Sequence, residues 1–346
     1  MYPILNRLNT GYKLFILALF CLVASSTVAQ KISPADKKIL GAKEDTLKEL
    51  SRNMVFAEEA ADRFRSDSHF IRTFVRALKT TNSFMYPFDS LSISKLYSPD
   101  STFRIFTWQM KKDEYVLLQK GAIQMKTSDG SLKLYPLFDN SMFTSKPNDS
   151  LRSAKNWIGA IYYRIIQKSY NGKNYYTLLG FDDFSVNSNK KWMDVLHFND
   201  NGEPMFGGQM ISFKEDSVKR PTQARFSIEY KKEARTFFNY DPDLDMIIVD
   251  HLISESDEPE KKFTYVPDGD YEGFKWQSGQ WVHVDKIFNE KLKDGEFPKE
   301  ALLLDDAGKA DEKKLEEASR KTFEREQNKN TPPKKNDPPK KKTGGN

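Results

Sequence analysis

The chain of 346 residues contains one cysteine, Cys21, which lies in a short apolar run near the N-terminus. Lys13 precedes the run from Leu14 to Ala24, and small residues follow it as far as Ala29. A basic start, a short apolar core and a small-residue end are the three parts of a secretory signal peptide. A membrane-spanning helix needs about 20 residues. We therefore expect a signal peptide over residues 1–29, cleavage after Ala29 and no transmembrane span after cleavage.

The lack of any other cysteine excludes several kinds of chemistry from the mature chain. Without residues 1–29 there can be no disulfide, no thiolate nucleophile and no cysteine-ligated metal. Phe20, which precedes Cys21, is not the small residue expected before a lipid-modified cysteine. The mature chain is long enough to be stabilised by packing alone. We expect an exported protein that stays in the periplasm or on the outer membrane, with an extracellular fate as the alternative.

Excess positive charge is absent from most of the chain. The formal net charge is +5, but residues 329–346 alone hold six lysines and one acid, so the remainder is neutral and has no electrostatic footprint for nucleic acid. The 329–346 tail is rich in Lys and Pro and lacks large apolar residues, which predicts disorder. Residues 289–328 are predicted to form a charged, partly helical extension. The tail contains the candidate contacts to an anionic envelope surface, with a merely solubilising role as the alternative: Lys334, Lys335, Lys340, Lys341 and Lys342.

Residues 30–80 have the pattern of a helical segment. Ser33 before Pro34 is typical of a helix start. Apolar residues spaced three and four apart predict one buried helix face, and Ser66–Ser68 predicts a break before a second helix. We expect this face to pack on the chain's own body, and the alternative is a docking face for a larger envelope complex. The face comprises Leu47, Leu50, Met54, Ala57, Ala61 and Phe64, continued after the break by Phe70, Phe74 and Leu78.

Residues 81–288 consist of short aromatic and β-branched runs separated by turn signals. Asn171-Gly172 between two such runs is the clearest hairpin. Phe226, Ile228 and Tyr230 alternate with polar residues, as in a strand with one buried face. The predicted fold class is therefore mainly β with N-terminal helices (α+β), its β domain being an antiparallel meander, a sandwich or an open barrel. A propeller ranks second, because no blade repeat is present.

Several segments in the middle of the chain carry a resemblance to a protein family. They are Asn82–Leu91, Ser98–Asp100, Phe103–Trp108, Tyr176–Gly180, Trp192–Leu196, Asp250–Leu252 and Pro267–Gly269. Through them the chain, over about residues 50–288, resembles a family of uncharacterised secreted or periplasmic proteins of Bacteroidota-type bacteria. The resemblance implies export in a cell with two membranes, and it implies no activity.

Candidate chemistry is sparse. His197, His251 and His283 each lie within a few residues of an aspartate and could together hold a zinc ion, or they are unrelated strand residues. Asp268 and Asp270 lie in an acidic stretch that could bind calcium or simply form a turn. The sequence has no Gly-x-Ser-x-Gly elbow and no phosphate-binding glycine loop. We therefore predict no cofactor and assign no catalytic or metal-binding residue.

Aromatic residues make up 13% of the chain, and their simplest role is core packing. Trp276 and Trp281, on either side of a predicted turn, are the best candidates for an exposed ligand surface. The resulting hypothesis is an exported, envelope-associated binding or structural module without catalytic activity, whose partner is an envelope glycan, an anionic lipid or an envelope protein. The alternatives are a hydrolase acting on an envelope glycan or peptide, and a subunit that docks through the N-terminal helix.

Overall fold

The computed structural model describes residues 30–287. The predicted signal peptide, the 289–328 extension and the lysine-rich tail lie outside the described residues. Within these residues no helix is long and apolar enough to cross a membrane.

Two helices open the fold, α2 (Pro34–Phe56) and α3 (Ala60–Leu78). The predicted start is confirmed, because Ser33 Oγ accepts a hydrogen bond from the Asp36 backbone N–H at 3.0 Å. The predicted break at Ser66–Ser68 is wrong, since α3 continues through it and the helices are separated at residues 57–59. Arg63 stabilises this earlier break by donating to the carbonyl oxygens of residues 57 and 58, which α2 leaves without helical partners.

Asp67 explains why the apparent cap at 66–68 lies within a helix. Its carboxylate pairs with Lys120 and accepts from Trp108 Nε1 at 3.3 Å, so it anchors α3 to a sheet instead of capping a helix. The early break also shifts the phase of the apolar face. Leu47 and Met54 are fully buried in the chain's own core, whereas Phe64 is exposed. The buried part of this face is therefore not a free docking surface.

The strands of the described residues form three sheets. The first has the order β1 (Ser94–Tyr97), β2 (Phe103–Lys111), β3 (Leu117–Met125) and β4 (Lys133–Phe138). The central sheet contains β5 (Arg152–Ser153), β6 (Ile161–Tyr170), β7 (Lys173–Asp182), β8 (Ser188–Phe198), β9 (Pro204–Phe206) and β11 (Phe226–Lys231). The third contains β10 (Ile211–Ser212), β12 (Phe238–Asp241), β13 (Met246–Ser254), β14 (Tyr265–Gln277) and β15 (Gln280–Val284).

This arrangement confirms the predicted fold class. All strand pairs are antiparallel except the short pair β10–β15, and residues 30–287 form neither a closed barrel nor a propeller. The predicted Asn171-Gly172 hairpin is also confirmed: it joins β6 to β7, and both turn residues have positive φ, +49° and +72°. Positive φ at both central residues gives the turn whose twist matches that of the flanking strands.

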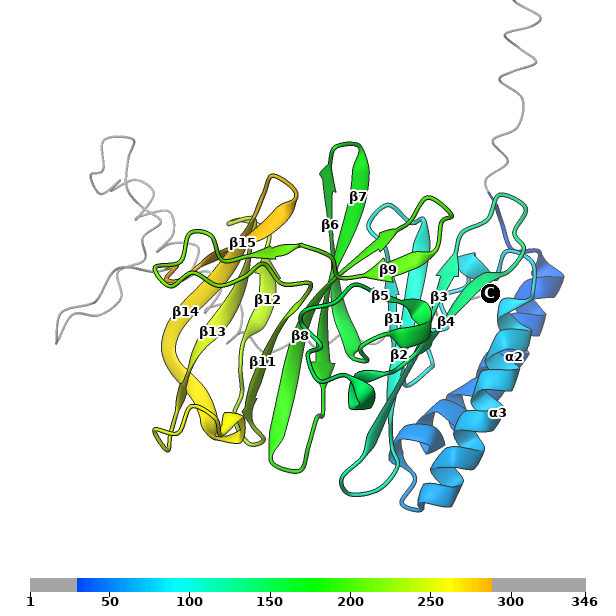
Figure 1. Cartoon of the computed structure of the whole chain (residues 1–346). Coiled ribbons are helices and arrows are strands. Elements are labelled where there is room, and N and C mark those ends of the chain that lie inside the picture. Colours follow the sequence, from blue (N-terminus) through cyan, green and yellow to red (C-terminus); the bar gives the residue numbers. More distant parts are fainter. Residues whose placement is uncertain (1–29, 288–346) are drawn as a thin grey trace, which may run out of the picture. The chain divides into compact units, whose positions relative to one another are not determined.

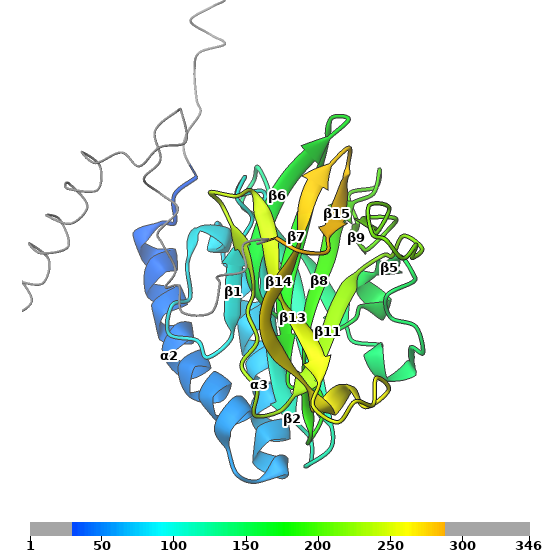
Figure 2. The same ribbon diagram turned by 90° about the vertical axis from the view of Figure 1, so that its left-hand side faces the viewer.

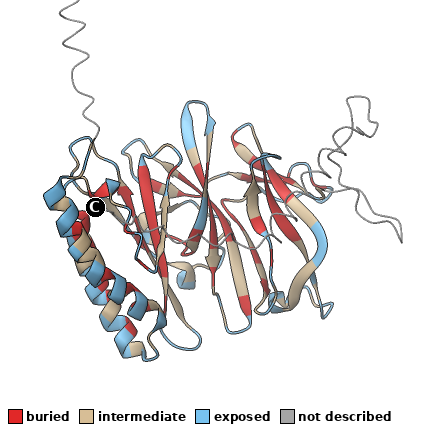
Figure 3. Cartoon of the chain, turned by 180° about the vertical axis from the view of Figure 1, so that it is seen from behind, coloured by how far each residue is buried: buried red, intermediate tan, exposed pale blue. Residues whose placement is uncertain are grey.

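The helices and sheets are stacked in layers (Figure 1). The helices cover one face of the first sheet, the other face packs on the central sheet, and the central sheet packs on the third (Figures 1 and 2). Strand β8 shows how the sequence produces this stacking. Trp192 and Leu196 belong to the core shared with the first sheet, whereas Met193 and Val195 belong to the core shared with the third. Successive side chains on a strand point to opposite faces, so the central sheet is buried on both sides (Figure 3).

Candidate functional site

The three histidines of the β domain do not share a site. His197 lies on β8, His251 on β13 and His283 on β15. His251 Nδ1 is 2.8 Å from Asp268 Oδ2, while His283 is bonded to other carboxylates. Among residues 30–287, no group of three or more histidine, cysteine or acidic side chains is placed to hold a metal ion.

Asp268 and Asp270 belong to strand β14, not to a turn. Each carboxylate has its own basic partner, His251 for Asp268 and Lys286 for Asp270 at 2.8 Å. Burial acts to raise the pKa of Asp268, but hydrogen bonds from the Asp270 backbone N–H and from His251 outweigh it and lower that pKa. These carboxylates act in separate ion pairs.

The candidate surface at Trp276 and Trp281 contributes mainly to the core. Trp281 is fully buried, and its Nε1 donates to Thr177 Oγ1 at 2.7 Å. Trp276 is half-buried and meets Trp281 edge to face, with ring centroids 5.4 Å apart. Trp281 therefore offers no ring face to a ligand, and only Trp276 keeps an exposed part.

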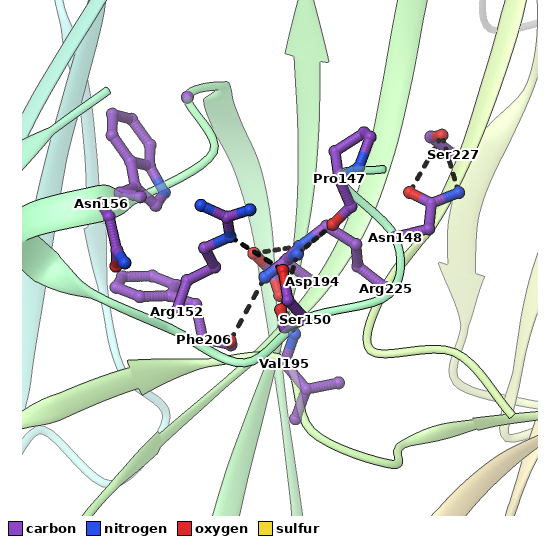
Figure 4. A network of polar contacts seen from close by, with 12 residues as sticks. Pro147, Asn148, Ser150, Arg152, Asn156, Asp194, Val195, Phe206, Arg225 and Ser227 are labelled. Carbon is purple, nitrogen blue, oxygen red and sulfur yellow. Dashed lines mark hydrogen bonds and ion pairs between the residues drawn. The ribbon is translucent and has the colours of Figure 1, made fainter. Parts of the chain in front are cut away.

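A buried ion pair fixes the loop that precedes β5. Arg225 Nε lies 3.1 Å from Asp194 Oδ2, and neither side chain is more than 3% exposed. The guanidinium also donates to the carbonyl oxygens of Pro147, Ser150 and Phe206 (Figure 4). One arginine thus ties the 147–150 segment to strands β8 and β9, and this segment forms one side of the hollow described next.

The best candidate site is a hollow of about 350 Å³ between β3, the 141–147 segment and the ends of β7 and β8. Three apolar side chains on its lining are exposed: Tyr115, Met142 and Phe184. Three polar side chains on its lining are buried, with exposed fractions of 4–7%: Gln119, Asp182 and Trp192. An apolar rim around a few buried polar groups is the usual make-up of a small-ligand site.

The polar floor is held together by Gln119. Its Nε2 donates to Asp182 Oδ1 at 2.7 Å and to Gln109 Oε1 at 2.9 Å, which uses both of its N–H groups. Gln119 Oε1 is buried and has no hydrogen-bond partner within the described part of the chain. Rotation of the amide would turn Oε1 onto the Asp182 carboxylate, so the charge of Asp182 fixes the orientation.

Burial disfavours the ionised form of the Asp182 side chain. Burial raises its pKa to about 6, and the carboxylate of Asp139 adds to the increase, although Gln119 and Lys190 act in the opposite direction. Perturbed carboxyl groups in a hollow are typical of functional sites.

Trp192 and Lys190 complete the floor. Trp192 Nε1 approaches the Asp182 carboxyl closely enough to help lower its pKa. It has no hydrogen-bond partner of normal geometry among residues 30–287. Lys190 Nζ lies 3.3 Å from the centroid of the Phe184 ring. The hollow therefore presents a free acceptor, a free donor, a carboxylate and one ammonium group.

Gly159 allows this floor to form. A Cβ at this position would lie 2.2 Å from Gln119 Cβ, so any larger residue would displace the Gln119 side chain. The backbone N–H of Gly159 donates to Asp139 Oδ1, which also accepts from the Ser141 N–H, both at 3.0 Å. Asp139 thus anchors the start of the 141–147 segment beside Gln119.

The sequence did not point to Gln119 or Asp182. The available signal was weak: Gln119 is a polar residue inside the mainly apolar run 115–125, and Asp182 directly follows the run 175–181. Comparison of the chain with protein families, with curated proteins and with solved structures finds no match.

Proposed function

We propose that the protein is an exported, envelope-associated module that binds a glycan in the hollow of Gln119, Asp182 and Trp192. The observation that carries the proposal is two buried atoms that lack hydrogen-bond partners among residues 30–287, Gln119 Oε1 and Trp192 Nε1, beside a buried carboxylate. A buried polar group that lacks a partner costs about 1–3 kcal/mol. A ligand that supplies the missing hydrogen bonds accounts for their placement in a hollow.

The three groups match the chemistry of sugar hydroxyls. Gln119 Oε1 accepts a hydrogen bond, Trp192 Nε1 donates one, and the second oxygen of Asp182 accepts when the carboxyl is ionised. A hydroxyl group both donates and accepts, so neighbouring hydroxyls on one ring can satisfy all three. A ligand with donors only would leave the indole N–H unpaired, and a ligand with acceptors only would leave the amide oxygen unpaired.

The rim suits the less polar face of a sugar ring. Tyr115 and Phe184 are exposed aromatic side chains on the hollow, and Met142 adds a flexible apolar surface. Aromatic rings bury large apolar areas with little loss of conformational freedom. Polar groups on the floor and apolar groups on the rim together support a carbohydrate over a purely apolar ligand.

The envelope location rests on the sequence. The 14–24 apolar run supports export, and the lysines of the 329–346 tail support attachment to an anionic surface. The resemblance to secreted or periplasmic proteins points to the same compartment.

Calorimetry with N-acetylglucosamine oligomers, together with co-sedimentation on cell-wall sacculi, tests the proposal. Gln119→Met removes the whole side-chain amide, both Oε1 and the Nε2 that bonds to Asp182 and Gln109. Trp192→Phe removes the indole N–H, and both variants keep most of the side-chain volume. Each should weaken binding about tenfold, since a hydrogen bond is worth about 0.5–1.5 kcal/mol and an unpaired partner costs more. Trp281→Phe is the matched control, because that indole bonds to Thr177 outside the hollow. Absence of binding, or binding that the hollow variants leave unchanged, would overturn the proposal.

A hydrolase is the second candidate function, and the pKa of about 6 for Asp182 favours it. A carboxyl group that titrates near neutral pH can act as a general acid toward a glycosidic oxygen. Glycosidases generally use two carboxyl groups, and Asp182 is the carboxylate that lines this hollow. Release of reducing ends from the bound oligomer, abolished by Asp182→Asn with binding retained, would establish catalysis.

A further inference from the structure

A second hollow, of about 360 Å³, adjoins the proposed glycan site. It is lined by residues of β11, β13 and β14, including Ser227, Glu229 and Glu272. Lys190 lines both hollows. The two hollows are therefore neighbours that share one long, flexible side chain.

Strand register makes the polar floor continuous from one hollow to the other. Asp182 of β7 lies directly opposite Lys190 of β8, and Lys190 lies directly opposite Glu229 of β11. Side chains directly opposite each other in antiparallel strands project from the same face, with Cβ atoms about 5 Å apart. An acid–base–acid row thus crosses three strands, beginning in the first hollow and ending in the second.

The Lys190 ammonium group lies within reach of both hollows. Its Nζ lies 3.3 Å from the Phe184 ring centroid and 3.3 Å from Glu229 Oε2. Phe184 lines the first hollow and Glu229 lines the second. A lysine carries a compact charge on a flexible stem, so rotation of this stem can redirect the ammonium group between partners.

The charges of the second hollow favour an anion. Its acids are already paired, Glu229 with Lys190 and Glu272 with the buried imidazole of His283 at 3.0 Å. Lys262 also lines this hollow and has no carboxylate partner within residues 30–287. An incoming carboxylate would meet this unpaired cation next to Lys190.

Building on the proposed glycan binding, we infer that the two hollows together bind a linear glycan that carries carboxylate groups. A ligand carboxylate replaces Glu229 as the partner of Lys190 at the junction. The neutral ring in the first hollow uses Gln119 and Trp192, and the acidic part of the chain extends over Ser227 toward the second hollow. No bond is made or broken in this step.

Two probe series with one sugar backbone test the inference. Neutral N-acetylglucosamine oligomers of two and six units are compared with peptide-free peptidoglycan strands of the same lengths, which carry a lactyl carboxylate on alternate sugars. The hexameric acidic strand should bind about tenfold more tightly than its neutral counterpart, and added salt should reduce this preference. The two dimers should differ much less, because they do not reach across both hollows.

Substitutions at the junction separate charge from general binding. Lys190→Met should abolish the preference for the acidic strand, so that acidic and neutral hexamers bind the variant equally tightly. Glu229→Gln should strengthen binding of the acidic strand about threefold, because it frees Lys190 from its internal partner. Lys79→Met, at an exposed lysine that follows α3, is the matched control.

The outcomes distinguish this inference from the proposed function. The inference alone would be overturned by two results together. Binding of neutral oligomers would depend on Gln119 and Trp192, while acidic strands would bind no more tightly and would not respond to Lys190→Met or Glu229→Gln. Failure of every glycan to bind would overturn both. If a pentaglutamate peptide binds through Lys190 and the glycans do not bind, the ligand of the second hollow is an acidic peptide and not a glycan.

Discussion

Gln119 Nε2 donates a hydrogen bond to Asp182 Oδ1 at 2.7 Å, and this bond joins strand β3 of the first sheet to strand β7 of the central sheet. The floor of the candidate site is therefore assembled where two layers meet. Its geometry depends on how the sheets pack, because neither sheet holds the full set of polar groups. A ligand that bonds to Gln119 and Trp192 would also strengthen the contact between the layers.

Asp182→Asn should stabilise the fold at neutral pH. The folded-state pKa of about 6 lies above the value of 3.8 for an unperturbed aspartate, so the folded protein holds this proton more tightly than the unfolded chain. The contribution of Asp182 to stability therefore falls as the pH rises from about 4 to 6, and it stays low above that range. The asparagine variant lacks this loss, so its free energy of unfolding at pH 7.5 should exceed that of the parent by up to about 3 kcal/mol.

Urea unfolding of both proteins at pH 4, 5, 6 and 7.5 measures this difference. The two stability curves should converge at the acidic end and separate as the pH rises. Asp200→Asn, at a fully exposed side chain, should show no such separation. A variant at position 182 that is less stable than the parent at pH 7.5 would show that the carboxylate is a net stabilising group.

Arg225→Met should destabilise the protein by about 3–5 kcal/mol, because it leaves the buried Asp194 carboxylate unpaired. The double variant Arg225→Met with Asp194→Asn should recover part of this loss, since it removes the uncompensated charge. Denaturant midpoints for the single and double variants provide the measurement. If the double variant were as unstable as the sum of both single changes, the bonds to the loop carbonyl oxygens would outweigh the ion pair.

Gly159→Ala should disturb the candidate site strongly, although it adds only one methyl group. The new methyl group would sit 2.2 Å from Gln119 Cβ and 2.9 Å from Asp139 Cγ, so both side chains must shift. We expect a loss of about 1–3 kcal/mol, as for other overpacked positions, together with weaker glycan binding. Gly172→Ala is the control, because its added Cβ would meet nothing within 4 Å. Its positive φ of +72° should lower stability without altering the hollow, so equal loss of binding in both variants would argue against a local effect.

The sequence predicted strands well where local chemistry determines them. The Asn171-Gly172 pair predicted its hairpin correctly, because that turn depends on its own two residues, which both have positive φ in the structure. The sequence was misleading at Pro267–Gly269, which has turn composition. There β14 runs on as a single long strand, but its register with β13 shifts between Pro267 and Tyr271 and Gly269 has a φ of +93°, so the turn-like residues form a bulge within the strand.

The candidate site was beyond local reasoning for a similar reason. Gln119 and Asp182 are 63 residues apart and lie in different sheets, so no spacing in the sequence marks them as neighbours. The histidines show the same limit. His251 follows Asp250, yet adjacent residues on a strand point to opposite faces, and the partner of His251 is Asp268 on the neighbouring strand.

His283 should titrate above the ordinary range for histidine, and His197 below it. His283 is buried, with Nδ1 2.8 Å from Asp216 Oδ1 and Nε2 3.0 Å from Glu272 Oε2. Burial acts to lower its pKa, but the bonds to Glu272 and Asp216 outweigh burial and raise it. For His197, burial lowers the pKa, and the nearby Asp194 only partly offsets it. Imidazole C–H shifts followed by NMR would measure both values.

The raised pKa of His283 links stability to pH above the ordinary histidine range. A cation favoured by folding contributes its full stabilisation below the ordinary histidine pKa of about 6.5, and this contribution is lost as the pH rises through the folded-state value. The loss lies above the range in which Asp182 titrates, so the two effects can be measured separately. Asp216→Asn should lower the pKa of His283 and move this loss of stability to lower pH. If His283 instead titrated below His197, the imidazole would be neutral between its carboxylates, and one of them would have to carry a proton.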